Sequence, residues 1–386
     1  ALGFWYGLAA HALVLNWMIV ALWHFTPLAA LGYVATITLE ALWIGALFWF
    51  VVRVRLRLPA VPLAVTFPVV WTAVEWAVGH QGDIRFPWLG IGTSLTDAPL
   101  LVQWADIAGA RGVTFWLAWC NVMIVDGVLP TVGARRALLR RLAPVALTVV
   151  AALGYGVWRE RTLPTRPVAV VGLVQPNEGF WEKWDPAHED SVVAKLVTLT
   201  RRLERQAHLD LVLWPEAAIP GYFLNHPQWD EGVARVARED HLPILTGGLD
   251  VEFSDPRTYA YYNAAFYYDS TGARDPSAAY RKHYLVPVVE RVPFIPPRWI
   301  HLKWFGGFGK GERLPVYGRP GARFGVLICY ESAFEDLPGA YRRRGADFLV
   351  NITNDAWFGR TSAPYQHESM LRMRAIEARM GVARAA

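Results

Sequence analysis

The apolar positions of the chain follow two different patterns. Long apolar runs with few charged residues fill the first part, and each approaches the roughly 20 residues that a helix needs to cross a bilayer. Five such runs lie at Phe4–Phe25, Leu28–Val52, Val61–Val78, Val113–Leu129 and Ala143–Trp158. The pattern predicts an α-helical transmembrane bundle of five spans over residues 1–158.

Beyond residue 158 the apolar runs are shorter and alternate with amphipathic stretches. Strand-like runs lie at Pro167–Val174, Leu209–Trp214, Ile244–Val251, Ala260–Tyr268, Arg323–Cys329 and Phe348–Thr353. Helical periodicity covers about residues 187–206, 229–239, 334–344 and 365–378. This alternation predicts an α/β domain built in layers over residues 159–386.

Composition and charge also indicate two environments. The chain is 54% hydrophobic and 18% charged, whereas an ordinary soluble domain has about 25% charged residues. The first 158 positions hold 15 charged residues, and the remaining 228 hold 56. The net charge is +5 without a dense basic run in the second part, which argues against nucleic acid as a partner. Because the sequence begins at Ala1 without a methionine, we expect it to be truncated, and we expect the same at its other end.

The distribution of arginine predicts an orientation. Cytoplasmic loops of membrane proteins carry an excess of basic residues. Arginines cluster between the second and third runs and between the fourth and fifth, at Arg53, Arg55, Arg57, Arg135, Arg136, Arg140 and Arg141. Both loops are therefore expected in the cytoplasm, which puts the domain after residue 158 on the extracytoplasmic side.

Three reactive side chains follow strand-like runs in the second part, namely Glu216, Lys282 and Cys329. The ends of strands are where α/β sheets commonly present catalytic groups. Each residue also has a simpler interpretation, as a surface ion pair, a solvated loop charge and a small buried apolar side chain, respectively. A free thiol outside the cytoplasm is a liability unless it is used, which favours a catalytic Cys329.

Together these groups can perform nucleophilic catalysis. A thiol is mostly protonated at neutral pH, so a nucleophilic Cys329 needs a base or a nearby cation. Glu216 can be the base, and Lys282 can favour the thiolate or stabilise the oxyanion of a tetrahedral intermediate. Supporting groups are Glu290 and Glu331, either of which can hold the lysine, and the backbone N–H of Tyr330 as a second oxyanion donor.

The neighbours of these residues resemble a known family. The segments concerned are Phe86-Pro-Trp88-Leu89, Trp214-Pro-Glu216-Ala-Ala-Ile-Pro220, Lys282-His-Tyr-Leu-Val-Pro287, Glu290-Arg-Val-Pro293, Cys329-Tyr-Glu331 and Asn354-Asp-Ala-Trp357-Phe358-Gly359. A Glu–Lys–Cys triad in this setting resembles the nitrilase superfamily. With the apolar first part, the segments resemble the apolipoprotein N-acyltransferases within it, over nearly the whole chain. The resemblance implies an αββα sandwich after the membrane domain.

The resemblance also implies a reaction. A bacterial inner-membrane enzyme of this kind moves an acyl chain from a phospholipid, through a thioester on Cys329, to the amine of an apolipoprotein's lipidated N-terminal cysteine. It implies no metal and no organic cofactor. The expected substrate contacts are Trp88, Trp184, Phe223, Asn354, Trp357 and Phe358.

Two other functions are compatible with the residues. The same triad with water as the acceptor would make a membrane-tethered amidase that hydrolyses C–N bonds. A transporter or receptor with an external binding domain is the non-enzymatic alternative, and it has no need of the triad. Glu40 lies inside the second apolar run, where carboxylates are rare and often functional, and its role is open. Val78 stands where the family has an arginine after Glu75, and Arg85 is the candidate to replace that arginine.

Overall fold

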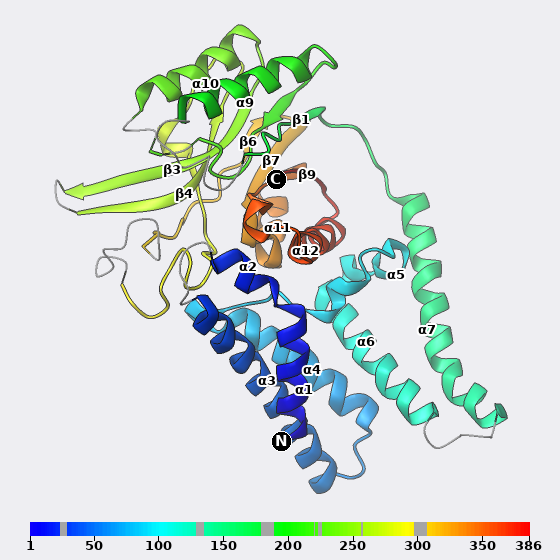
Figure 1. Ribbon diagram of the computed structural model, residues 1–386. Helices are drawn as coiled ribbons and strands as arrows, with labels where there is room; N and C mark the ends of the chain where they lie inside the picture. The colour runs from blue at the N-terminus through cyan, green and yellow to red at the C-terminus, as the bar shows by residue number, and fades with distance from the viewer. Residues whose placement is uncertain are drawn as a thin grey trace. The chain divides into compact units, whose positions relative to one another are not determined.

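The structure forms two units, each with its own packing. The computed structural model describes residues 1–23, 29–128, 135–178, 189–219, 221–222, 226–255, 258–296 and 307–386 (Figure 1). The first unit consists of Ala1–Pro164 and Phe358–Arg379, and the second of Thr165–Trp357 and Met380–Ala386.

The first unit is helical. Its α-helices are α1 (Leu2–Val14), α2 (Trp17–Trp23), α3 (Ala29–Arg57), α4 (Leu63–His80), α5 (Pro99–Val102), α6 (Ala105–Val128), α7 (Arg135–Thr162) and α12 (Ala363–Ala378). Two 3-10 turns, η1 (Gly82–Ile84) and η2 (Ile91–Leu95), lie between α4 and α5. In chain order α12 comes between two strands of the second unit, but its contacts assign it to the first.

Three of these helices are long and apolar enough to cross a membrane, over Ala30–Arg57, Ala105–Asp126 and Leu142–Thr162. Helices α1 and α2 meet at a 55° bend, and they would make a fourth span if they act as one. The sequence predicted five spans, one of them in α4. Helix α4 is not among the described helices that are apolar enough to cross a membrane. Its 18 residues include the polar Glu75 and His80, which lower its hydropathy.

Helices α1 and α3 pack closely because α1 carries glycines on the facing side. A Cβ on Gly7 would lie 2.9 Å from Cβ of Ile44 and 3.1 Å from Cα of Ala41. Small residues that let helix backbones approach are characteristic of helix pairs in membranes. The hydroxyl of Tyr33 also bonds to the carbonyl of Ala12, 2.7 Å away.

An ionic network fixes the end of α12 within the first unit. Oδ2 of Asp106 accepts bonds from Nε of Arg379 and Nε of Arg159, both at 2.9 Å, and its Oδ1 accepts from the hydroxyl of Tyr155. Asp106 is in α6 and Arg159 in α7, so one carboxylate joins three helices.

The second unit is built on two sheets. The first has the order β1 (Val171–Leu173), β2 (Leu211–Leu213), β3 (Ile244–Asp255), β4 (Thr258–Tyr268) and β5 (Tyr280–Arg281), with parallel pairs β1–β2 and β2–β3 and antiparallel pairs beyond. The second has the order β6 (Tyr317–Arg319), β7 (Ala322–Ile328), β8 (Phe348–Ile352) and β9 (Gly381–Ala385), with β7, β8 and β9 parallel.

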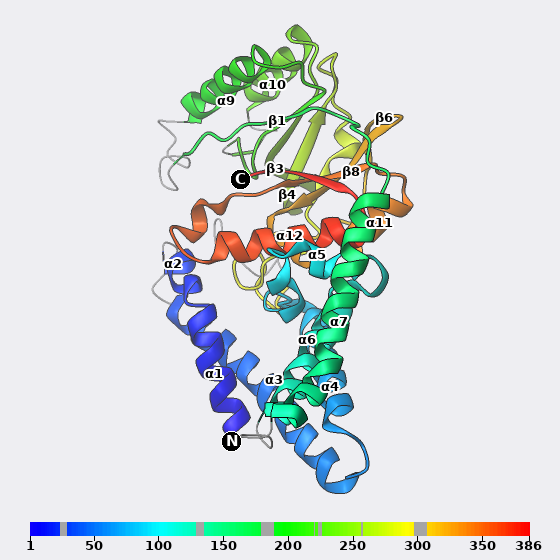
Figure 2. The same ribbon diagram turned by 90° about the vertical axis from the view of Figure 1, so that its right-hand side faces the viewer.

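Helices cover these sheets. Helices α9 (Glu189–Glu204) and α10 (Pro227–Glu239) lie side by side over the first sheet in both views (Figures 1 and 2). Their apolar faces share one core cluster with strand and loop residues such as Trp214 and Phe266. Helix α11 (Asp336–Arg343) packs on β7, where the absence of a side chain at Gly325 makes room for the ring of Tyr341. The six predicted strand regions form strands, whereas β5, β6 and β9 were not predicted from the sequence.

The loop after β2 crosses β3 at a position that admits no side chain. A Cβ on Gly247 would lie 2.5 Å from the carbonyl oxygen of Pro215 and 2.6 Å from the amide nitrogen of Ala217. These are backbone atoms, so they cannot move aside as the tip of a side chain can. Gly247 therefore fixes how closely the loop that carries Glu216 approaches the sheet.

We expect Gly247→Ala to lower the stability of the protein by about 2 kcal/mol or more, because the added methyl group overpacks this crossing. A matched change, Gly232→Ala in α10, meets open space and should raise the stability by up to about 1 kcal/mol through helix propensity. The midpoint of thermal unfolding in detergent measures both. Equal midpoints for the two variants would contradict the close approach.

Candidate active site

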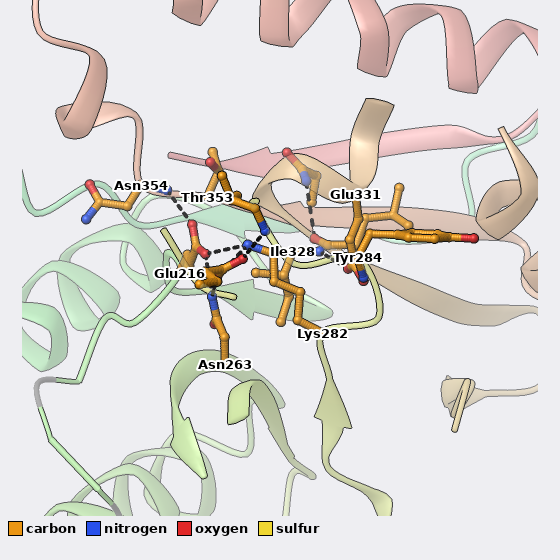
Figure 3. Close-up of polar contacts among 12 residues, drawn as sticks. Glu216, Asn263, Lys282, Tyr284, Ile328, Glu331, Thr353 and Asn354 are labelled. Carbon is orange, nitrogen blue, oxygen red and sulfur yellow. Dashed lines mark hydrogen bonds and ion pairs between the residues drawn. The ribbon is translucent and has the colours of Figure 1, made fainter. Parts of the chain in front are cut away.

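Glu216 lies in the loop after β2, held by bonds to its main chain and side chain. Its N–H donates to the carbonyl of Thr353 at 3.3 Å. Its carboxylate accepts from the side-chain amide of Asn263 at 2.7 Å on Oε1 and from the N–H of Asn354 at 3.1 Å on Oε2 (Figure 3). The side chain is buried, so the two oxygens are fixed in place.

Lys282 follows β5 and is only 1% exposed. Its Nζ lies 2.9 Å from Oε1 of Glu290 and 3.4 Å from Oε1 of Glu216. Burial lowers the pKa of Lys282, but the charges of Glu290 and Glu216 outweigh it and raise that pKa above its ordinary value. The lysine is therefore a fixed cation at neutral pH.

Asn263, in β4, joins the two carboxylates and was not singled out in the sequence. Its Nδ2 donates to Oε1 of Glu216 at 2.7 Å and to Oε1 of Glu290 at 2.9 Å, while its backbone carbonyl accepts from the N–H of Lys282. The signal in the sequence is a single amide inside the apolar run 260–268. Such a residue needs partners when it is buried, and here they are the two glutamates.

Cys329 begins the 3-10 turn η7 (Cys329–Ala333) directly after β7, with φ at 51°. Left-handed backbone is uncommon for a residue with a side chain and is characteristic of strained functional turns. Burial and the charge of Glu216 raise the pKa of the Cys329 thiol, against the opposing effects of Lys282 and the hydroxyl of Thr353. At neutral pH the thiol is protonated, so it needs a base before it can attack.

Glu331 ties the segment after Lys282 to the start of the cysteine turn. It is fully buried and accepts bonds from the N–H groups of His283 at 2.6 Å and Ile328 at 2.7 Å, and from the hydroxyl of Tyr280 at 2.7 Å (Figure 3). A longer bond of 3.3 Å comes from the N–H of Tyr284. The sequence left Glu290 and Glu331 as alternatives for holding Lys282. In the structure Glu290 bonds to Nζ, whereas Glu331 bonds to the backbone beside the lysine.

The structure distributes the expected substrate contacts over several places. Asn354 bonds to Glu216 through its backbone N–H, and Trp357, three residues later, is half-buried. Trp88 and Phe358 are buried in an aromatic cluster of the first unit with Trp17. Trp184 and Phe223 lie outside the described residues. A role for any of these side chains in binding substrate stays a prediction.

Two histidines, His283 and His367, pack against aromatic rings. Burial lowers the pKa of His283, which stacks on Tyr280 and bonds through Nδ1 to the carbonyl of Arg281. His367 is fully buried and stacks on Trp88. Among the residues that the structure describes, no group of three or more His, Cys, Asp or Glu side chains could hold a metal ion.

Comparisons with known proteins cover both parts of the chain. The family model of the apolipoprotein N-acyltransferase N-terminal domain matches residues 1–123, and that of carbon-nitrogen hydrolase matches residues 168–386. Relatives named apolipoprotein N-acyltransferase include one from Geobacter metallireducens, 33% identical over 100% of this chain and 74% of its own length. Another, from Chlorobaculum tepidum, is 32% identical over 97% of this chain and 74% of its own length.

Similar solved structures include an amidase from Nesterenkonia sp., with 21% identity, 58% of this chain and 78% of that chain covered, and a TM-score of 0.41. Saccharomyces cerevisiae Nit3, described as a member of the nitrilase superfamily, has 19% identity and covers 58% of this chain and 79% of its own, with a TM-score of 0.42.

We expect Glu331→Gln to destabilise the protein more at pH 5 than at pH 8. Burial raises the pKa of Glu331 to about 7 against the opposing effect of its donors, so folding favours its protonated form. The stability gained from this protonation is fully present below the ordinary pKa near 4.5 and is lost as the pH rises through about 7. Glutamine does not titrate. The loss of stability caused by Glu331→Gln should therefore be about 2 kcal/mol larger at pH 5 than at pH 8.

Thermal unfolding of wild type and variant at the two pH values measures this difference. The exposed Glu312→Gln is the matched control, for which we expect no such change. A deficit of Glu331→Gln that is the same at both pH values would show that Glu331 keeps an ordinary pKa.

Proposed function

The chain belongs to the apolipoprotein N-acyltransferase family, and we propose that it transfers an acyl chain from a membrane phospholipid to the α-amine of an apolipoprotein's lipidated N-terminal cysteine. Glu216, Lys282 and Cys329 are the catalytic groups in this proposal. The observation that carries it is the buried cluster in which Lys282 lies between Glu216 and Glu290 and interacts electrostatically with the Cys329 thiol.

In the first half-reaction, Glu216 removes the proton of the Cys329 thiol as the sulfur attacks the ester carbonyl of the phospholipid. A general base is required because the pKa of this thiol is raised. The tetrahedral intermediate bears a negative oxygen, which the ammonium of Lys282 and the N–H of Tyr330 stabilise. When the intermediate collapses, the lysophospholipid leaves with the proton from Glu216, and a thioester remains on Cys329.

In the second half-reaction the amine of the apolipoprotein replaces the lysophospholipid. Glu216 takes a proton from the attacking amine, which adds to the thioester carbonyl. The same two donors stabilise the second tetrahedral intermediate. Collapse breaks the C–S bond, the proton returns from Glu216 to Cys329, and the amide product is released. Glu216 thus accepts and returns a proton in both half-reactions, and Cys329 is the nucleophile in the first and the leaving group in the second.

Transfer is favoured over the amidase alternative by the extent of the family match. Relatives named apolipoprotein N-acyltransferase align with both the helical part and the catalytic part of the chain. Exposed apolar side chains on the helices, such as Leu147 on α7, are suited to a lipid environment. A membrane provides both a lipid donor and a lipidated acceptor. An enzyme that hydrolyses soluble amides does not need to lie in a membrane.

The proposal includes a location, a bacterial inner membrane with the catalytic unit on the extracytoplasmic side. Arg53, Arg55 and Arg57 close the C-terminal end of α3, and the arginines at 135–141 precede the span in α7. Both groups are typical of cytoplasmic ends. Since α7 ends at Thr162, directly before the second unit begins, that unit would follow on the opposite side.

We expect Cys329→Ala to form no acyl adduct with phospholipid, while Glu216→Gln and Lys282→Met reduce turnover by 100-fold or more, as is typical for single catalytic groups. Because all three groups act on one intermediate, the double variant of Glu216 and Lys282 should lose much less than the product of the single losses. Intact mass after exposure to phospholipid measures the adduct, and amide formation on a lipidated peptide measures turnover. Near-normal activity of Cys329→Ala would refute the covalent mechanism.

The orientation is tested with a thiol reagent that does not cross membranes. In a background without the native cysteines Cys120 and Cys329, we expect Thr271→Cys, on an exposed turn after β4, to be labelled in intact spheroplasts. Ala137→Cys, among the arginines at 135–141, should be labelled only after lysis. The reverse pattern would place the catalytic unit in the cytoplasm.

A further inference from the structure

The first unit contains a cavity of about 390 Å³ that none of the catalytic groups uses. Its wall is formed by α1, α3, α4, the segment 86–94, α6 and α12, and two basic side chains, His11 and Arg111, belong to it. The lining is mainly apolar and includes Trp43, Trp71, Val78, Phe86, Trp88 and Leu89. A volume of this size is in the range of small-molecule sites and is far larger than a few ordered waters require.

Glu40 is a buried carboxyl group in this wall without a partner. It lies on the inward face of α3, one turn from the buried Ile37 and Ile44, and is 7% exposed. Within the part of the chain that the structure describes, its Oε1 has no hydrogen-bond partner. A buried carboxyl group without donors is costly, so this position favours a ligand that supplies them.

Glu75, a second glutamate in the same wall, receives its hydrogen bonds from the protein. Glu75 accepts from the indole N–H of Trp71 and the N–H of Ile91 on Oε1, and from Arg111 and the hydroxyl of Thr114 on Oε2. All of its donors belong to the protein, and they fix the segment 86–94 to α4 and α6. Glu75 therefore has a structural role, whereas Glu40 has oxygen available for a ligand.

Glu40 lies close to the level of α3 at which the neighbouring helix α4 ends. The indole N–H of Trp43 bonds to Oε1 of Gln81, directly after the end of α4, so this level of α3 lies beside the end of its neighbour. Glu40 is nearly one turn further toward the start of α3. It is about 20 Å along the helix from Arg53, at the basic end. Glu40 thus lies in the half of the helix farther from that end.

We propose that this cavity binds a lipid that carries a primary ammonium group, with the carboxylate of Glu40 as its counter-ion. An ammonium supplies the missing donors and a compensating charge, and the indoles of Trp43 and Trp71 in the wall suit a cation. The apolar remainder of the wall suits the attached lipid. The assignment of the ligand rests on the proposed function, in which both the phospholipid donor and the apolipoprotein amine can carry this group.

The binding test uses the Cys329→Ala protein and lipids with ether-linked chains, which cannot be cleaved. A dialkyl phosphoethanolamine and a dialkyl phosphoglycerol are compared in detergent by native mass spectrometry. We expect the phosphoethanolamine lipid to bind more tightly, and Glu40→Gln to weaken it 10-fold or more while leaving the phosphoglycerol lipid unchanged. The matched control is Glu160→Gln, an exposed position on α7, which should change neither. Equal binding of the two lipids, or binding of both unaffected by Glu40→Gln, would overturn the proposal.

The two sources of the ammonium are separated in the protein that retains Cys329. If the ligand is the phospholipid headgroup, Glu40→Gln slows acyl-enzyme formation from phosphatidylethanolamine but not from phosphatidylglycerol. If it is the apolipoprotein amine, the variant slows only the discharge of a preformed acyl-enzyme by a lipidated peptide. Unchanged rates in both steps would overturn the role of Glu40 in substrate binding. Failure of the wild type to form any acyl-enzyme would refute the proposed function instead, and the ether-lipid measurement would still decide the cavity.

Glu40→Gln preserves shape and removes only a charge, so we expect an unfolding midpoint at or above that of wild type. A large fall in the midpoint would mean that Glu40 has a structural role, and this would count against the proposal.

Discussion

The catalytic unit depends on one constraint, the burial of the Lys282 ammonium between two carboxylates. A buried charge is tolerated only when its partners are close and their own remaining oxygens are satisfied. Here Nζ lies 2.9 Å from Glu290 and 3.4 Å from Glu216. The remaining bonds to these carboxylates come from Asn263 and from backbone N–H groups, including that of Val286 at 2.8 Å from Glu290. The ends of β2 and β5, the middle of β4 and two loops must therefore meet at one point.

This cluster also determines the state of the nucleophile. Two carboxylates and one ammonium give it a net negative charge, and the half-buried Cys329 interacts with it electrostatically. Burial and this charge disfavour a thiolate, which is why the pKa of the thiol is raised despite the nearby lysine. In the proposed mechanism, reaction begins when the carbonyl oxygen of a substrate takes up the developing charge next to Lys282 and Glu216 takes the proton of the thiol.

Two glutamates of the helical unit, Glu75 and Glu40, also show that a buried carboxyl group needs hydrogen-bond donors. Glu75 has four donors and no spare oxygen, and one of its donors is Arg111 of α6. The sequence offered Arg85 in place of the arginine expected after Glu75, and in the structure Nε of Arg85 bonds to the carbonyl of Gly82. Glu40 received no such set of donors. The difference between a structural and a ligand-binding carboxyl group is thus a matter of which neighbours the fold supplies.

The sequence by itself determined the division into a helical and an α/β part, and it singled out Glu216, Lys282 and Cys329 as candidates, because apolar periodicity and local motifs are properties of neighbouring residues. It also marked most of the strands that carry them. Strands β5, β6 and β9 were not predicted because pairing with neighbouring strands, and not their own composition, makes them strands. The roles of Asn263 and Thr353, the choice of Glu290 over Glu331 as the partner of Lys282, and the pairing of Glu75 with Arg111 required the tertiary structure. Each depends on a hydrogen bond or ion pair between residues that are 8 to 137 positions apart. A single sequence does not show which of its distant groups come into contact.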